Sequence, residues 1–121
     1  MTIAERTSIA VRLEAIQHQV QEINRLVTSN TPADIEIARE TFTRLKEHLK
    51  TEYDRMQTTK GQEKLSQGEQ AFYLPAIQDA WANTELSETR ADWAPGKWHN
   101  ALWNVQDYMQ HHLSSLRRVA D

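Results

Sequence analysis

The chain contains no cysteine among its 121 residues. Without thiols, disulfide bridges, thiolate metal sites and cysteine nucleophiles are all excluded. No run of apolar residues approaches the ~20 that a membrane-spanning helix needs. The N-terminal segment MTIAERTSIAVRLEAI has charged residues where a signal peptide has an uninterrupted apolar stretch. We therefore expect a cytoplasmic protein with no membrane partner.

Glycine and proline are also scarce, with 3 of each. This leaves little turn material for a β-protein and suits long helices. The proportions of apolar residues, 39%, and of charged residues, 26%, are ordinary for a small globular protein. A chain of this length buries one core. We therefore expect a single helical domain over residues 1–121.

The charge pattern and the absence of common enzyme motifs reduce the classes of function that the sequence supports. The net charge is −3, and the basic residues are interleaved with acidic ones rather than gathered on one segment. Nucleic acid is therefore not an expected partner. The sequence contains no G-x-S-x-G element, no P-loop and no glycine-rich nucleotide turn. No catalytic residue and no cofactor is predicted, and enzyme activity is not indicated.

The first half of the chain predicts two long helices joined by a short polar turn. Apolar residues at steps of four and three predict a helix over residues 3–27, which ends at the segment TSNTP. Thr31 is suited to cap the second helix, with Pro32 in its first turn and Asp34 completing an acidic capping box. The predicted apolar stripes are Ile9, Leu13, Ile16, Val20, Ile23 and Val27, then Ile35, Ala38, Phe42, Leu45, Leu49 and Met56.

The second half predicts two further helices. Residues 58–70 are polar and read either as a loop or as a helical extension, and a capping box of Ser66 and Glu69 begins the third helix. Pro75 lies inside that helix and is expected to kink it or to split it at Leu74. A long connection, residues 83–96, precedes the last helix, predicted from about residue 95 to 119. The apolar stripes of these helices are Leu74, Ile77 and Trp81, then Trp98, Leu102, Val105, Met109, Leu116 and Val119, with Trp93 and Trp98 as a hydrophobic staple.

Four helices with such stripes indicate an all-α fold, an antiparallel up-and-down four-helix bundle with a long connection before the last helix. Three polar residues interrupt the stripes: Arg6, Glu52 and His112. His112 occupies the position between Met109 and Leu116 where the four-three pattern requires an apolar residue. In the up-and-down arrangement all three lie toward one end of the bundle. We therefore predict a polar layer, which fixes the register of the helices.

A ligand site is the alternative for the same residues, because His48 lies one turn before Glu52. The segment LKEHLKTEYDRM resembles the H-x-x-x-E helix of hemerythrin-like proteins, and FYLPAI is similar to the apolar-proline turn of that family. The resemblance implies a four-helix bundle that binds a metal or small ligand, here through His48, Glu52 and His112. Iron sites of that family take histidines from several helices. His18, His99 and His111 lie off the stripes, so no metal is assigned.

Arg12 and His18 offer a weaker alternative. Their R-x5-H spacing is similar to that of helical nucleases of the HEPN type. Both side chains are expected to project mainly toward solvent, which places them away from any enclosed site.

A tryptophan on the outer face of the last helix is the best candidate for binding. Trp103 is rotated roughly 140° from Trp98 about the helix axis, away from the apolar stripe. Its neighbours on that face are His99, Gln106 and Gln110, with Tyr108 on the flank. The ring is expected to be covered by residues 84–95, by a second copy or by another protein. The sequence therefore favours a non-enzymatic protein-interaction or regulatory module, with a homodimer as one form of the interaction.

Overall fold

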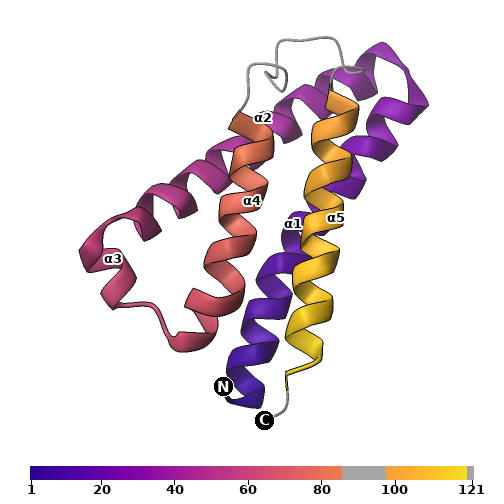
Figure 1. The fold of residues 1–121 in the computed structure, drawn as a ribbon. Helices are drawn as coiled ribbons and strands as arrows, with labels where there is room; N and C mark the ends of the chain where they lie inside the picture. Colours follow the sequence, from indigo (N-terminus) through magenta and orange to yellow (C-terminus); the bar gives the residue numbers. More distant parts are fainter. Residues whose placement is uncertain (86–97, 120–121) are drawn as a thin grey trace.

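Figure 1 shows the computed structural model, which describes residues 1–85 and 98–119, without the side chains of residues 85, 99 and 100. Every regular element in these two ranges is helical. The elements are α1 (Ile3–Ser29), α2 (Pro32–Gln57), α3 (Thr59–Glu63), a π-helical turn η1 (Glu69–Tyr73), α4 (Leu74–Glu85) and α5 (His99–Arg117).

The four long helices form an antiparallel up-and-down bundle, as predicted. Helix α1 packs against α2 and α5, and α4 packs against the same two helices, so the four close into a ring. Successive long helices alternate in direction (Figure 1). The beginning of α1 therefore lies beside the end of α5, where Arg6 Nη1 donates to the carbonyl oxygen of Val119 at 2.6 Å.

The turn between α1 and α2 follows the sequence signals closely. Helix α1 ends at Ser29, and Asn30 has a φ of 54°, a left-handed conformation that asparagine tolerates well. The hydroxyl of Thr31 accepts from the backbone N–H of Asp34 at 3.3 Å, and Pro32 is the first residue of α2. The predicted cap and start of the second helix are confirmed.

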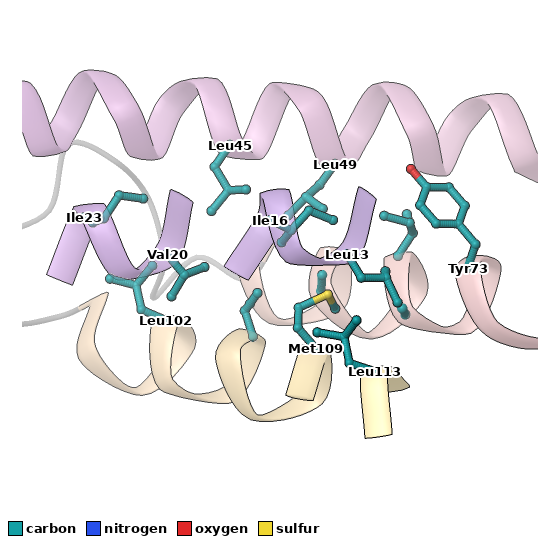
Figure 2. Close-up of a cluster of buried hydrophobic side chains, with 14 of the residues drawn as sticks. Leu13, Ile16, Val20, Ile23, Leu45, Leu49, Tyr73, Leu102, Met109 and Leu113 are labelled. Atoms are coloured by element: carbon teal, nitrogen blue, oxygen red, sulfur yellow. The ribbon is translucent and has the colours of Figure 1, made fainter. Parts of the chain in front are cut away.

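The core is built from the predicted stripes, with local changes of register. Figure 2 shows apolar side chains from α1, α2 and α5 meeting between the helices. In α1, Leu26 is buried in place of the predicted Val27, which is only partly covered. Trp98 is fully buried and stacks on Phe42, with ring centroids 4.9 Å apart. Trp93, its predicted staple partner, and the predicted helix start near Pro95 lie outside the described residues.

The third predicted helix begins where the sequence indicates. The backbone N–H of Glu69 donates to Ser66 Oγ at 3.1 Å, and the N–H of Ser66 donates to Glu69 Oε1 at 3.3 Å. This reciprocal pair is the capping box. The polar segment before it contains one short helix, α3, so the helical alternative for residues 58–70 holds in part.

Pro75 does not split this helix, so of the two predicted alternatives, a kink or a break at Leu74, the break is wrong. The backbone is helical from residue 67 to residue 85, and the turn just before the proline is π-helical. In that turn the N–H of Leu74 bonds to the carbonyl of Glu69, five residues back. The wider turn gives room for the proline ring, which clashes with an α-helical turn. Its extra residue also rotates the buried face. The buried side chains are Tyr73, Ala76, Ile77, Ala80 and Thr84, whereas the predicted Leu74 and Trp81 are partly exposed.

The last helix also departs from the predicted stripe, and His112 is not its missing member. Leu113 is 1% exposed and points into the core beside Met109 (Figure 2), while His112 lies on the flank. A straight α-helix drifts by about 20° per heptad against a strict seven-residue repeat. At 3.6 residues per turn, position 112 lies about 40° to one side of Trp98 and position 113 about 60° to the other, so both border the buried face and the apolar leucine takes the buried place.

Candidate functional site

The three polar residues predicted to form one layer have separate partners. Arg6 bonds to the backbone of Val119, as described above. His112 Nε2 lies 2.8 Å from Asp79 Oδ2 of α4. Glu52, near the C-terminal end of α2, accepts hydrogen bonds from the side chains of Tyr73 and Arg55. The prediction of a single polar layer is therefore wrong, because rotation of the helices gives each residue a different neighbour.

Glu52 belongs to a partly buried cluster around Tyr73, a residue that the sequence did not single out. The Tyr73 hydroxyl donates to Glu52 Oε1 at 2.7 Å, and Arg55 Nε donates to Glu52 Oε2 at 2.8 Å. Tyr73 is 1% exposed, and Figure 2 shows its hydroxyl directed toward α2. The side chains of Tyr73, Glu52 and Arg55 therefore tie the π-helical turn to α2.

Burial and hydrogen bonding shift the pKa values of this pair in opposite directions. Burial has the largest effect on Tyr73, and together with the hydrogen bond to Glu52 it raises the pKa of the phenol well above its ordinary value of 10.0. Burial alone would raise the pKa of Glu52. The hydrogen bonds from Tyr73 and Arg55 outweigh it, and the pKa of Glu52 falls below its ordinary 4.5. At neutral pH the pair is a neutral phenol that donates to a carboxylate.

Arg12 covers the other side of Tyr73. Its guanidinium carbon lies 4.2 Å from the centre of the Tyr73 ring, and its Nη1 is 3.2 Å from Glu69 Oε2. The Nε atom of Arg12 is buried with no hydrogen-bond partner in the described part of the chain. The negative ring face of Tyr73 is therefore an important neighbour of this cation. The expectation that Arg12 projects mainly toward solvent is wrong, although His18 is exposed as expected.

The Tyr73 cluster, defined as Arg12, Glu52, Arg55, Glu69 and Tyr73, is suited to holding helices together. The phenol proton is already donated to a carboxylate, and the ring is closed to solvent. Arg12 is turned into this cluster, so it is not paired with His18 in a nuclease site. The cluster carries no arrangement of nucleophile, base and open space that catalysis needs.

The residues proposed for a ligand site are not gathered either. His48 is exposed on α2, one turn from Glu52, and His112 is paired with Asp79. Among residues 1–85 and 98–119, no three histidine, aspartate or glutamate side chains are grouped to hold a metal ion. The predicted set of His48, Glu52 and His112 therefore does not form a metal site in this fold.

The predicted interaction surface, in contrast, is brought together. Trp103 is 60% exposed and borders a surface groove of about 320 Å³ between α1 and α5. Gln106 and Gln110 line the same groove, as predicted. The other lining residues are Asp107 of α5 and Gln17 and Gln21 of α1. We call this set the Trp103 groove. The side chain of His99, predicted on the same face, lies outside the described part of the chain.

Gln110, which lines the Trp103 groove, forms two side-chain hydrogen bonds. Gln17 Nε2 donates to Gln110 Oε1 at 3.0 Å, and Gln110 Nε2 donates to Ser114 Oγ at 3.3 Å. These bonds connect α1 to α5 and fix the orientation of the Gln110 amide. The groove therefore contains a hydrogen-bonded contact between the two helices.

A second hollow continues along α5. It has a volume of about 450 Å³ and shares Asp107 and Gln110 with the Trp103 groove. Tyr108, predicted on the flank, lines it and is 39% exposed. Its remaining lining residues are His111, Ser114 and Arg118. The two hollows together make one face of α5 with an exposed aromatic residue in each.

Residues that the sequence did not single out complete these sites. Tyr73 and Asp79 lie on the helix that Pro75 was expected to disrupt, so their facing could not be derived from a regular period. Gln17 and Gln21 reach the groove because α1 and α5 are neighbours. The apolar periodicity of α1 already indicated that both glutamines lie off its buried face.

Comparison with known proteins gives no match to any family model, curated protein or solved structure. None of the described helices combines the length and the apolar character that a membrane-spanning segment requires. The functional argument therefore rests on the chain's own residues.

Proposed function

We propose that this chain is a non-enzymatic protein-interaction module that acts in the cytoplasm and contacts its protein partner through the Trp103 groove. The observation that carries the proposal is the exposure of Trp103, 60%, beside a groove between α1 and α5. A tryptophan buries roughly 150–250 Å² when it is covered. Because Trp103 is 60% exposed, the part left in water forgoes roughly 2–4 kcal/mol of hydrophobic free energy.

The surroundings of Trp103 suit a protein partner better than a small molecule. The lining is dominated by glutamines, whose amides both donate and accept hydrogen bonds, and it carries a single charge, Asp107. Interfaces favour an aromatic anchor surrounded by polar groups and disfavour charge at their centre. The groove is open and shallow, whereas small-molecule sites enclose most of the ligand.

The proposal is tested with Trp103→Ala and a matched control. Ile37 is also a large exposed apolar residue, 45% exposed, on α2, so Ile37→Ala removes exposed apolar surface elsewhere. Self-association is measured by light scattering, and association with other proteins by co-purification from the native cells. We expect whatever association the wild type shows to be lost in Trp103→Ala and retained in Ile37→Ala.

Two results would contradict the proposal. One is a wild-type protein that associates neither with itself nor with another protein. The other is an association that is equally strong in wild type and Trp103→Ala, since the contact would then lie elsewhere.

A further inference from the structure

The outward face of α5 carries one continuous row of side chains between its two neighbouring helices. The row recurs at helical steps and spans roughly 22 Å at 1.5 Å per residue. We call it the α5 stripe. Its members are Trp103, Asp107, Gln110, His111, Ser114 and Arg118, all exposed except the partly exposed Ser114.

The chemistry of the α5 stripe is distributed about its midpoint, which falls between Gln110 and His111. Trp103 and Arg118 are equally far from this midpoint in opposite directions, and so are Asp107 and Ser114. An aromatic ring thus mirrors a cation, and a carboxylate mirrors a hydroxyl. Such a distribution is self-complementary under a two-fold rotation perpendicular to the helix.

Several of these groups have unused bonding capacity within the chain. Neither Asp107 nor Arg118 forms a side-chain hydrogen bond or ion pair in the described residues. Ser114 Oγ accepts from Gln110, which leaves its own proton available to an acceptor outside the chain. The face therefore presents a donor, an acceptor, a cation and a ring.

We infer that the α5 stripe pairs antiparallel with the same stripe of a second copy of this chain, with the two-fold axis passing between Gln110 and His111. The inference rests on the proposed function and names its partner. In this register Trp103 lies opposite Arg118 of the second copy, which is a cation–π arrangement. Asp107 lies opposite Ser114 of the second copy, whose hydroxyl donates to the carboxylate.

Charge complementarity selects the antiparallel arrangement over the parallel one. In the antiparallel register each Asp107 lies within one turn of the second copy's Arg118, roughly 6 Å along the axis. The two Asp107 carboxylates are then about 10 Å apart along the axis, and the two Arg118 cations are farther apart. Parallel pairing would set Asp107 against Asp107 and Arg118 against Arg118, which is repulsive.

One helix face is a small interface, and this sets the expected strength. Stable complexes bury about 800 Å² per partner, and smaller contacts are transient. The stripe alone supplies part of this area, and Gln17 and Gln21 beside Trp103 extend it. We therefore expect a dissociation constant of micromolar order, so the mass must be followed over a range of protein concentration.

The first test is the mass of the intact chain by light scattering. The wild type is expected to approach twice the 14.1 kDa of one chain as its concentration rises. Trp103→Ala and Arg118→Glu should each raise the dissociation constant at least about tenfold, as for an interface anchor. The exchange variant Asp107→Arg/Arg118→Asp restores opposite charges one turn apart but loses the contact between Trp103 and Arg118, so it should recover only part of the dimerisation that Arg118→Glu loses.

Cross-linking tests the register, because the chain has no cysteine of its own. Disulfides require Cα atoms within about 7 Å. Position 110 lies near the proposed two-fold axis, so the Gln110→Cys variant should form a disulfide between the same position of the two chains. Asp107→Cys alone and Ser114→Cys alone should not, whereas a mixture of the two variants should cross-link to each other. Glu47→Cys, exposed on α2, is the control and should remain uncross-linked.

The outcomes separate the inference from the proposed function. A wild type that stays monomeric, yet binds another protein through Trp103, overturns the inferred dimer but supports the proposed interaction module. A dimer in which Asp107→Cys cross-links to itself overturns the antiparallel register. A dimer indifferent to Trp103→Ala, Arg118→Glu and the cysteine positions overturns both. Circular dichroism of each variant checks that a monomeric mass reflects loss of dimerisation and not unfolding of the chain.

Discussion

Tyr73 and Trp103 are both aromatic residues set among polar side chains, yet they lie in opposite environments. Tyr73 is 1% exposed, and Trp103 is 60% exposed. The Tyr73 hydroxyl donates to Glu52, and an arginine packs over its ring. The Trp103 ring instead borders an open groove. A buried aromatic with its polar groups bonded contributes to folding, whereas an exposed ring leaves apolar area in water.

The largest expected effect is on the buried side of this comparison. Tyr73→Ala leaves a cavity and removes a donor from Glu52, and should lower the free energy of unfolding by about 4 kcal/mol. Urea unfolding followed by circular dichroism measures it. Tyr73→Phe keeps the volume and loses only the hydroxyl, so it should cost about 1–2 kcal/mol. A loss below 1 kcal/mol in Tyr73→Ala would mean that the cluster is not part of the stabilising core.

The next effect is a pH dependence carried by Glu52. Its pKa is lower in the folded state than its ordinary 4.5, so its stabilising contribution is fully present above that pH. The contribution is lost as the pH falls through the lower folded value. Glu52→Gln should therefore be less stable by about 1–2 kcal/mol at pH 7, with a flatter decline in acid. Unfolding free energies between pH 2 and pH 7 test this, and Glu47→Gln, exposed on the same helix, should follow the wild type.

Tyr73 makes the stabilising contribution of the same cluster depend on alkaline pH. Its pKa is raised above 10.0 in the folded state. The stability that depends on the neutral phenol is therefore fully present below pH 10 and declines as the pH rises through the higher folded value. Tyr73→Phe should not show this decline. An identical alkaline profile in wild type and Tyr73→Phe would contradict the assigned hydrogen bond.

A smaller effect is expected at the capping box that begins the third helical segment. Ser66→Ala removes the acceptor for the N–H of Glu69 and should cost about 1 kcal/mol. Glu69→Gln separates two contributions, because glutamine retains the capping box but breaks the ion pair with Arg12. Ser8→Ala, exposed on α1, is the control. Ser66→Ala behaving like Ser8→Ala would show that the cap does not limit stability.

The elements that the sequence predicted well are those whose signals are local. The Thr31 cap, Pro32 at the start of α2 and the Ser66–Glu69 box each depend on residues within one turn. The all-α bundle followed from periodicity summed over long segments. Both kinds of signal are reliable, because the side chains that predict a helix also form its capping bonds and its buried face.

The errors arose where the rotation of one helix about its axis decides the outcome. The π-helical turn before Pro75 adds a residue, which turned Tyr73 inward and gave Glu52 a partner that a regular period did not indicate. In α5 positions 112 and 113 both border the buried face, and there Leu113 is in the core while His112 pairs with Asp79. A shift of one position changes which side chains meet, so the predicted polar layer failed while the fold held.

The Trp103 surface was predictable for the opposite reason. An outward position tolerates the same rotation of a few tens of degrees, because no precise neighbour is needed for a side chain to face solvent. Trp103, Gln106 and Gln110 therefore lie together as predicted, although the prediction for His112 on the same helix was wrong. Exposure of a large ring is the part of the candidate site that periodicity alone establishes.

The smallest expected effect on stability completes the comparison with Tyr73. Trp103→Ala should change the free energy of unfolding by no more than about 0.5 kcal/mol, measured at concentrations where the chain is monomeric. Trp98→Ala on the same helix is the matched control, because Trp98 is fully buried against Phe42 and should cost about 3–5 kcal/mol. A loss above 1 kcal/mol in Trp103→Ala would show that the ring is stabilised within its own chain. An unchanged stability together with lost association would instead assign its contribution to binding alone.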